Sequence, residues 1–396
     1  MPKIVWLLVI GMVVNVTGSS FLWPLNAIYI HDHLGKSLSV AGIVLMLNAA
    51  ASVVGNLYGG HLYDKIGGFK SVMLGIGITF ISLIGLTFWH GWPHYVIFLI
   101  MIGFGSGVVH PAMYAMAGTS WKSGGRKAFN AMYVAANIGV AIGSALGGLV
   151  ASLSFNYIFF ANMVFYFVYL LIAFFGYRSI SDSEVRPTTI IQEKKRFAIS
   201  KNLISVLIIS TGFFLCWMAY VQWQTTIATY TQEINISLSQ YSLLWTINGA
   251  LIVFAQPVLS IFTKKVKSLK TQIIIGLFVF IAAFSVASIS ELFIGFVTAM
   301  VIMTVGEMLI WPAVPTIAND LAPKGKEGFY QGVVNSAATC GRMIGPLLGG
   351  LIADYLGMSY LFVILIVLFF VAMITTLTYD RVIKKQENVK SIQITS

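Results

Sequence analysis

Twelve apolar segments, each long enough to cross a lipid bilayer, constrain this chain more than any other feature of its sequence. A membrane-spanning helix needs about 20 mostly apolar residues, and a backbone in lipid must satisfy all of its own hydrogen bonds. The segments lie near residues 5–30, 38–62, 71–89, 94–118, 128–151, 157–177, 202–226, 240–262, 271–289, 292–318, 328–352 and 359–379. Only 9% of the 396 residues are charged, against about 25% in soluble domains. The sequence therefore predicts an all-α polytopic membrane protein.

The basic residues are distributed unevenly among the loops, and their distribution predicts the orientation of the chain. Of the 24 Lys and Arg residues, Lys36 lies in a loop predicted to face outside and Arg342 lies within a segment. The other 22 lie at the N-terminus, in alternate loops or in the tail. Basic loops stay on the cytoplasmic side, so we expect a protein of the cell membrane with both termini in the cytoplasm. Anionic lipid headgroups explain the net charge of +11 without a nucleic-acid partner.

A polar, basic stretch separates the first six segments from the last six. The expected domains are an N-terminal six-helix bundle over residues 1–178, a cytoplasmic linker over 179–201, a C-terminal six-helix bundle over 202–380 and a cytoplasmic tail over 381–396.

An internal repeat supports this division, because matching residues lie 200 to 202 positions apart throughout the comparison. The clearest matches pair Gly105, Ser106, His110 and Pro111 with Gly306, Glu307, Trp311 and Pro312. Two parallel halves with a site near the middle of the bilayer are typical of secondary transporters.

Glu307 is the strongest single candidate for a functional residue. The stretch Val301–Ile317 reads as one helix that is apolar except for this carboxylate. A charge at such depth costs about 2.5–3.5 kcal/mol on insertion scales, so it indicates function. Trp311, four residues later, shares its helix face. Arg342 is the second charge within a segment, and its depth allows a pair with Glu307; backbone or polar groups are the alternative partners.

The turn after the second segment predicts a conformational latch. Its residues, which we call the latch motif, are Gly60, Asp64, Lys65, Gly67 and Lys70. A glycine lets two helices approach closely. The acid and the bases can pair with each other, or with a neighbouring helix end, in one conformation and separate in another. The alternative is an ordinary basic cytoplasmic turn.

Small residues in the fifth and eleventh segments predict close helix packing. They are Gly139, Gly143 and Gly147 in the fifth segment and Gly341, Gly345, Pro346 and Gly349 in the eleventh. We expect both runs to make tight, bendable contacts across the two halves. For the fifth segment, simple small-residue packing is the alternative.

These motifs resemble those of the major facilitator superfamily. The latch motif is similar to its motif A, and the run in the eleventh segment is similar to its motif C. The run from Ile302 to Glu307, with Pro312 and Thr316 after it, looks like a signature of the drug:proton antiporter branch and of its LmrP-like multidrug transporters. The resemblance covers nearly the whole chain and implies twelve helices in two pseudo-symmetric halves. It also implies that Glu307 binds a proton or a drug.

The sequence departs from this family at several positions. Gly68 stands where motif A usually has a base. Met132 and Gln224 stand where LmrP-like proteins have acids, and the arginine found in the fourth helix of many drug antiporters is missing. The number of coupled protons therefore stays open.

The resemblance also implies that the first, fourth, seventh and tenth helices line the substrate cavity. Helical spacing then selects Asn15, Ser19, Trp23 and Asn26; Ser106, His110 and Tyr114; Trp217, Tyr220 and Gln224; and Glu307 with Trp311. An aromatic cavity with one acid suits lipophilic cations. For a single aromatic residue, packing or an interfacial position is the alternative. The candidates for proton coupling are Glu307, His110 and Arg342; for His110, a hydrogen bond within its own helix is the alternative.

The sequence thus predicts a transporter, not an enzyme, that exports small lipophilic or cationic compounds in exchange for protons. A nucleotide-binding loop, a metal-ligand cluster and a catalytic triad are all missing from it, which argues against an ATP-driven pump and predicts no cofactor and no metal. The expected partners are a small-molecule substrate, protons and membrane lipids, and we expect a monomer. One alternative is a proton-coupled transporter of a single metabolite, such as a sugar or an amino-acid relative. Another is a membrane receptor or lipid-handling protein that transports nothing.

Overall fold

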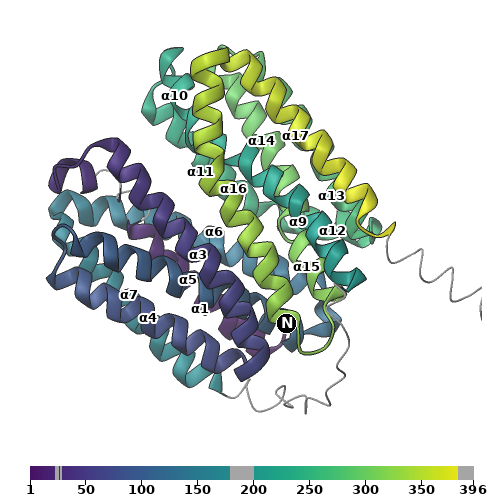
Figure 1. The fold of residues 1–396 in the computed structure, drawn as a ribbon. Helices are drawn as coiled ribbons and strands as arrows, with labels where there is room; N and C mark the ends of the chain where they lie inside the picture. Colours follow the sequence, from purple (N-terminus) through teal and green to yellow (C-terminus); the bar gives the residue numbers. More distant parts are fainter. Residues whose placement is uncertain (23–25, 27–28, 179–199, 382–396) are drawn as a thin grey trace, which may run out of the picture. The chain divides into compact units, whose positions relative to one another are not determined.

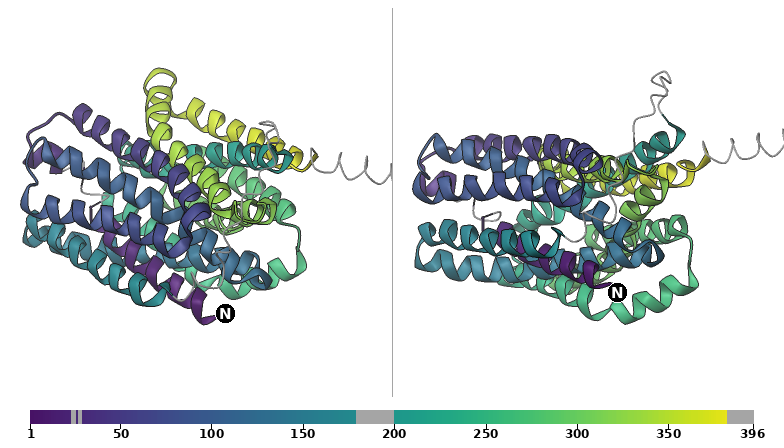
Figure 2. Two further views of the ribbon diagram at one scale, coloured as in Figure 1. Left: turned by 60° about the horizontal axis from the view of Figure 1, so that its bottom comes forward. Right: turned by 90° about the horizontal axis from the view of Figure 1, so that it is seen from below.

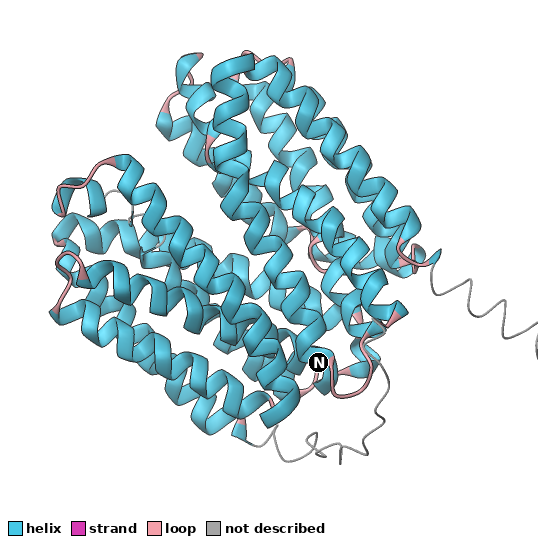
Figure 3. Ribbon diagram, in the orientation of Figure 1, coloured by secondary structure: helices cyan, strands magenta, loops and turns pink. Residues whose placement is uncertain are grey.

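The computed structural model confirms an all-α membrane fold. It describes residues 1–22, 26, 29–178 and 200–381. Within these residues the chain forms helices joined by short loops, and no strand is present (Figure 3). Ten of the described helices are long and apolar enough to cross a membrane, and one bent helix pair brings the number to eleven. The eleventh predicted segment forms a further helix, α16 (Glu327–Leu356), which is 30 residues long.

The contacts divide the chain into two compact units, whose helices Figures 1 and 2 show from three directions. The first unit comprises Met1–Thr188 and Pro323–Ser336, and the second comprises Thr189–Ala322 and Ala337–Ser396. The beginning of α16 therefore packs with the first unit, while the rest of this helix packs with the second.

Six long helices build the first unit, together with short helical turns at Tyr29–His33 and Lys122–Gly124. They are α1 (Lys3–Leu22), α3 (Leu38–Ile66), α4 (Gly68–Phe88), α5 (His94–Ser120), α6 (Arg126–Leu153) and α7 (Phe155–Gly176). Helix α5 packs against α3 and α4, and α1 packs against α6 and α7. The buried side chains between them include three tyrosines, Tyr166, Tyr169 and Tyr177.

The second unit contains more and shorter helices. They are α9 (Lys201–Tyr220), a 3-10 turn (Val221–Gln224), α10 (Thr226–Glu233), α11 (Leu238–Phe254), α12 (Gln256–Lys265), α13 (Leu269–Ser288), α14 (Phe293–Ile310), α15 (Ala313–Leu321), the main part of α16 and α17 (Met358–Thr378). Helix α13 packs against α14 and α17, α9 packs against α17, and α11 packs against α14.

Three segments that the sequence predicts as continuous are interrupted in the second unit. The stretch Val301–Ile317 lies within one helix of spanning length, Phe293–Leu321, which is interrupted locally because α14 ends at Ile310 and α15 begins at Ala313. A proline has no N–H to donate, and its ring collides with the carbonyl group four residues earlier. The pair α11 and α12 is bent by 57°. Helix α9 ends at Tyr220, where the 3-10 turn begins.

Equivalent glycines bring neighbouring helices together in both units. A Cβ atom added to Gly105 of α5 would lie 2.8 Å from the carbonyl oxygen of Gly75 in α4. A Cβ atom added to Gly306 of α14 would lie 2.9 Å from the carbonyl oxygen of Gly276 in α13. Both distances are too short for a real Cβ contact, so only glycine allows this approach. The two pairs correspond in the repeat, which therefore extends to the packing of the helices.

Two tight turns between helices have the same backbone conformation. Gly67 joins α3 to α4 with φ +86° and ψ +166°, and Gly357 joins α16 to α17 with φ +90° and ψ +165°. Positive φ values of this kind favour glycine. An acid precedes each glycine by three residues: Asp64 in the first turn and Asp354 in the second. The two acids differ in their surroundings, because Asp64 is partly buried and Asp354 is exposed.

Candidate functional site

Asp64 caps the N-terminus of α16. Its Oδ1 accepts a hydrogen bond of 2.8 Å from the Gly328 N–H, and its Oδ2 accepts one of 2.9 Å from the Phe329 N–H. These two residues follow Glu327, the first residue of α16, so their N–H groups have no partner within the helix. The positive end of the helix dipole also faces the carboxylate. Of the partners that the sequence left open, the structure therefore shows a neighbouring helix end.

The glycines of the latch motif make this contact sterically feasible. A Cβ atom on Gly60 would lie 2.8 Å from the carbonyl carbon of Gly328, so the two backbones touch. Gly67 forms the turn that ends α3, and its N–H donates to the Tyr63 carbonyl. Lys65 and Lys70 are exposed. Three residues of the motif thus have different structural roles: Gly60 permits the close approach, Asp64 accepts the hydrogen bonds and Gly67 forms the turn.

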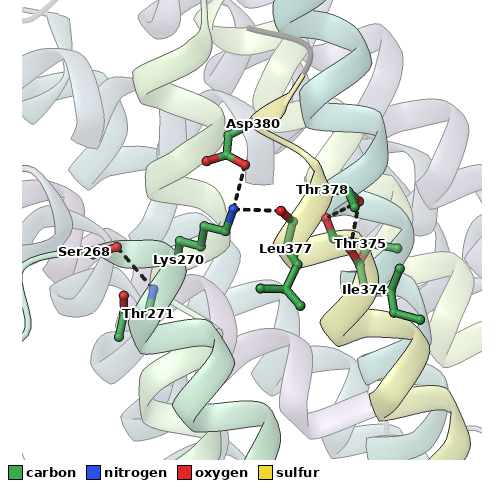
Figure 4. Close-up of polar contacts among 8 residues, drawn as sticks. All are labelled: Ser268, Lys270, Thr271, Ile374, Thr375, Leu377, Thr378 and Asp380. Carbon is green, nitrogen blue, oxygen red and sulfur yellow. Dashed lines mark hydrogen bonds and ion pairs between the residues drawn. The ribbon is translucent and has the colours of Figure 1, made fainter. Parts of the chain in front are cut away.

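The corresponding turn of the second unit is built differently. Ser260 and Lys264 stand at the positions equivalent to Gly60 and Asp64, so the acid is missing there. Lys270 forms the main polar contact of this turn: its Nζ lies 2.6 Å from Asp380 Oδ1 and donates to the Leu377 carbonyl at 2.8 Å (Figure 4). A cation at the C-terminal end of α17 is favourable for the helix dipole. This contact therefore joins α13 to the end of α17 and differs from the contact that Asp64 makes with α16.

The nearest neighbours of the glycine runs in α6 and α16 lie within their own units, and the expected contacts across the two halves stay a prediction. In α6, Gly139, Gly143 and Gly147 lie against the backbone of α1. In α16, Gly341, Gly345 and Gly349 lie against α9 and the turn that follows it. Small residues let the nearest helix approach, and here the nearest helix belongs to the same half. Pro346 lies inside α16, which continues past it.

Glu307 is buried near the end of α14, with 2% of its surface exposed. Its Oε2 accepts hydrogen bonds from the Tyr220 hydroxyl at 3.2 Å and from the Asn248 side-chain amide at 2.9 Å. The amide nitrogen of Asn248 also lies 2.9 Å from the Thr304 hydroxyl oxygen, one turn before Glu307. Side chains of α9 and α11 therefore hydrogen-bond a carboxylate of α14.

Tyr220, which bonds to this carboxylate, belongs to a cluster of four aromatic rings that we call the aromatic wall, made of Phe213, Trp217, Tyr220 and Trp311. The two indole rings are stacked, with centroids 4.6 Å apart and planes 10° from parallel. The ring of Tyr220 meets each indole edge-on at 5.4 Å. Phe213 meets Trp311 edge-on, also at 5.4 Å. The wall belongs to α9 and to the break between α14 and α15.

Arg342 reaches the same wall from α16. Its guanidinium carbon lies 4.6 Å from the centroid of the Trp217 ring, within cation–π distance. One guanidinium nitrogen also lies 3.4 Å from the Thr339 hydroxyl oxygen. The side chain is exposed although it lies midway along a 30-residue helix. A direct pair between Glu307 and Arg342 stays a prediction.

The candidate residues of the first unit contact different partners and are not shown to form one cluster. Asn15 in α1 is buried, and its amide nitrogen has no hydrogen-bond partner among the described residues. Asn26 accepts a hydrogen bond of 2.7 Å from the Tyr95 hydroxyl. His110 Nδ1 lies 3.0 Å from the Ser106 carbonyl oxygen of its own helix, and the ring of Tyr114 stacks on Phe129. Trp23 lies outside the described residues.

The sequence did not indicate Asn248 as a site residue. It also placed Gln224 on one helix face with Trp217 and Tyr220, which the structure does not confirm. Asn248 lies in the eighth predicted segment, which the expected cavity lining did not include. The available signal was an amide in the middle of an apolar segment, where a polar group needs a partner. Gln224 lies in the 3-10 turn after α9, so the α-helical spacing from Trp217 and Tyr220 does not extend to it.

The arrangement can bind a cation and exchange a proton. A carboxylate with aromatic faces beside it attracts a positively charged, apolar molecule through charge and cation–π contact. The same carboxylate is the only acid in this cluster of described side chains. No group of three or more His, Cys, Asp or Glu residues in the described part of the chain could hold a metal ion.

Comparison with known proteins identifies the kind of protein that carries this site. The family model of the Major Facilitator Superfamily matches residues 8–232 and 212–394. The MFS-type transporter YttB of Bacillus subtilis is 58% identical over the whole of both chains. The quinolone resistance protein NorA of Staphylococcus aureus is 25% identical over 89% of this chain and 91% of its own. A solved bacterial homologue of the iron transporter ferroportin, in an outward-facing state, has a TM-score of 0.77 at 12% identity, over 95% of this chain and 99% of its own.

Proposed function

Because this chain belongs to the Major Facilitator Superfamily and is an MFS-type transporter, we propose that it exports small lipophilic or cationic compounds in exchange for protons. The resemblance to LmrP-like drug:proton antiporters supports export, as does the similarity to a quinolone resistance protein. We place this multi-pass protein in the plasma membrane with both termini in the cytoplasm, as the basic loops predict. The proposed transporting unit is a monomer.

The observation that carries the proposal is the environment of Glu307. A carboxylate buried in a membrane segment is costly, so its presence indicates a function, and this one bonds to Tyr220 of the aromatic wall. The Tyr220 hydroxyl and the Asn248 amide both donate hydrogen bonds to it. A charged Glu307 therefore offers its negative charge to a cation on the wall, while a protonated Glu307 offers none.

Competition at this carboxylate provides the coupling. A proton and a cationic substrate both stabilise their bound state through the same negative charge, so each lowers the affinity of Glu307 for the other. Export then follows if protons enter from outside, displace the substrate there and leave on the inner side. The contact between Asp64 and the start of α16 would stabilise one conformation of this cycle and separate in the other.

Glu307→Gln tests the proposal, because glutamine keeps the size and hydrogen bonding of the side chain but cannot titrate. We expect the variant to fold and to reach the membrane, and to lose proton-driven uphill export. The measurement is proton release on addition of a cationic dye to proteoliposomes. The matched control is Glu291→Gln, the same change at an exposed residue between α13 and α14, which should behave as the wild type. Normal coupled proton movement by Glu307→Gln would refute the proposal.

A further inference from the structure

A cavity of about 410 Å³ lies in the second unit, where the start of α13 meets the ends of α15 and α17. The basic loops predict that this end of the helices is cytoplasmic. Its lining includes two lysines, two aspartates and a tyrosine: Lys267, Lys270, Asp320, Asp380 and Tyr379. The volume is within the range of ligand-binding pockets, and neither Glu307 nor the aromatic wall contributes to the lining.

Two of the charged residues already bind each other. Lys270 Nζ lies 2.6 Å from Asp380 Oδ1 and also donates to the Leu377 carbonyl (Figure 4). Lys267 and Asp320 are both exposed, and neither has an ion-pair partner among the residues that the structure describes. The cavity therefore contains one positive and one negative side chain that are available to a ligand.

The helix ends add to both of these charges. Lys267 directly precedes Ser268, the N-cap of the 20-residue helix α13, whose first N–H groups have no partner within the helix. Asp320 lies in the last turn of α15, where the helix dipole is negative. The cavity thus has a positive pole at the start of α13 and a negative pole at the end of α15. A ligand with both an anionic and a cationic group is complementary to it.

Tyr379 lies close to the negative pole. Burial, together with the charges of Asp380 and Asp320, raises the pKa of Tyr379 to about 12. The hydroxyl group therefore stays protonated at neutral pH and remains a hydrogen-bond donor. Tyrosine is also common at the level of lipid headgroups, because its ring is apolar and its hydroxyl is polar.

The outer face of α17 connects the cavity to the lipid. Three apolar side chains at a spacing of three residues, Val371, Ile374 and Leu377, are 40%, 59% and 43% exposed. Exposed apolar side chains on a membrane-spanning helix face the acyl chains. The last of them, Leu377, is also the residue whose carbonyl accepts the hydrogen bond from Lys270. An apolar track therefore ends at the edge of the cavity, which favours a lipid over a soluble ligand.

We propose that this cavity binds the headgroup of a phospholipid that carries a primary amine. The phosphate would lie at Lys267 and the start of α13, the ammonium group at Asp320, and the acyl chains along the exposed face of α17. A quaternary ammonium group has no N–H to donate to Asp320, and a glycerol headgroup has no positive charge. Both should therefore bind less tightly. The inference goes beyond the proposed export function and does not depend on it.

Three phospholipids with identical dioleoyl chains provide the test: phosphatidylethanolamine, phosphatidylcholine and phosphatidylglycerol. Native mass spectrometry of the delipidated full-length protein in detergent measures the Kd of each lipid. We expect the wild type to bind phosphatidylethanolamine about three- to tenfold more tightly than the other two. Asp320→Asn should abolish this preference, and Asp320→Glu should retain it. Lys267→Gln should weaken all three lipids to a similar extent, because each of them has the phosphate.

Matched variants separate the cavity from the rest of the surface. Lys265→Gln and Asp354→Asn make the same changes at exposed residues outside the cavity lining, so they should leave all three affinities unchanged. The midpoint of thermal unfolding checks that each variant is folded. Equal affinity of the wild type for phosphatidylethanolamine and phosphatidylcholine, or a preference that survives Asp320→Asn, would overturn the inference. Displacement of phosphatidylethanolamine by similar concentrations of free phosphoethanolamine would also overturn it, because the ligand would then be a soluble compound.

Discussion

Replacing Asp64 by asparagine should detach the start of α16 from α3 while leaving the binding of substrate intact. Asp64 makes its two hydrogen bonds to the Gly328 and Phe329 N–H groups, whereas Glu307 is hydrogen-bonded by Tyr220 and Asn248. Asparagine has one oxygen acceptor in place of two, and its amide group would face the second N–H as a donor facing a donor. The substitution also removes the charge that the helix dipole favours.

The structure allows an estimate of the effect. A hydrogen bond to a charged group contributes about 1.5–3 kcal/mol, and a charge at a helix end about 0.3–1 kcal/mol. Asp64 is partly exposed, so we take the lower end of these ranges: one bond lost and one weakened cost about 2 kcal/mol. That cost changes the ratio of attached to detached molecules roughly thirtyfold, which is enough to slow a transport cycle that visits both states.

Spin labels at two exposed positions, His61 in α3 and Lys324 before α16, provide the assay. Double electron–electron resonance would report the fraction of molecules with the longer distance, and proteoliposome flux would report the rate. The matched control is Asp354→Asn, which changes the exposed acid of the second, similar turn. Wild-type distances and flux in Asp64→Asn would show that the contact does not control the conformational equilibrium.

Two further predictions concern the turn and the orientation. Gly67→Ala should cost about 1–2 kcal/mol of stability, because alanine is strained at the positive φ of this turn. Its control, Gly77→Ala, should not lower the midpoint of thermal unfolding, since no atom lies within 4 Å of the added methyl group. Equal midpoints for the two variants would contradict this reading of the turn. Single cysteines at Ser183 and Ser391, in a chain without its two native cysteines, should resist an impermeant thiol reagent in intact cells. Rapid labelling of either one would reverse the proposed orientation.

The helices were predictable from the sequence because few backbone structures are stable in a lipid bilayer. A long apolar segment must form a helix to satisfy its backbone, so composition alone identifies it. The breaks were harder to predict. Pro312 follows the end of α14, whereas Pro111, its equivalent in the repeat, lies inside a continuous α5. Neighbouring groups can compensate for a proline in a membrane helix, and a single sequence does not show which groups will lie beside it.

The contacts of the candidate site were only partly predictable, for a related reason. Spacing of three or four residues places Trp217 with Tyr220 and Glu307 with Trp311, because one helix fixes each pair. The partner of Asp64 lies 264 residues away in the chain, and no local pattern indicates it. Asn248 was missed in the same way, since its contact with Glu307 connects α11 to α14 over 59 residues.

The hydrogen bonds of Glu307 explain why this carboxylate could change its charge without a large rearrangement. The Tyr220 hydroxyl and the Asn248 amide both bond to Oε2. Both bonds become weaker when the charge of the carboxylate is lost. A lysine or arginine bound directly to Oε2 would instead oppose protonation through its own charge. Neutral donors that hold one oxygen thus keep the carboxylate in position in both of its states, and the negative charge alone changes between them. In the proposed cycle, this carboxylate takes a proton in one half and attracts a cation in the other.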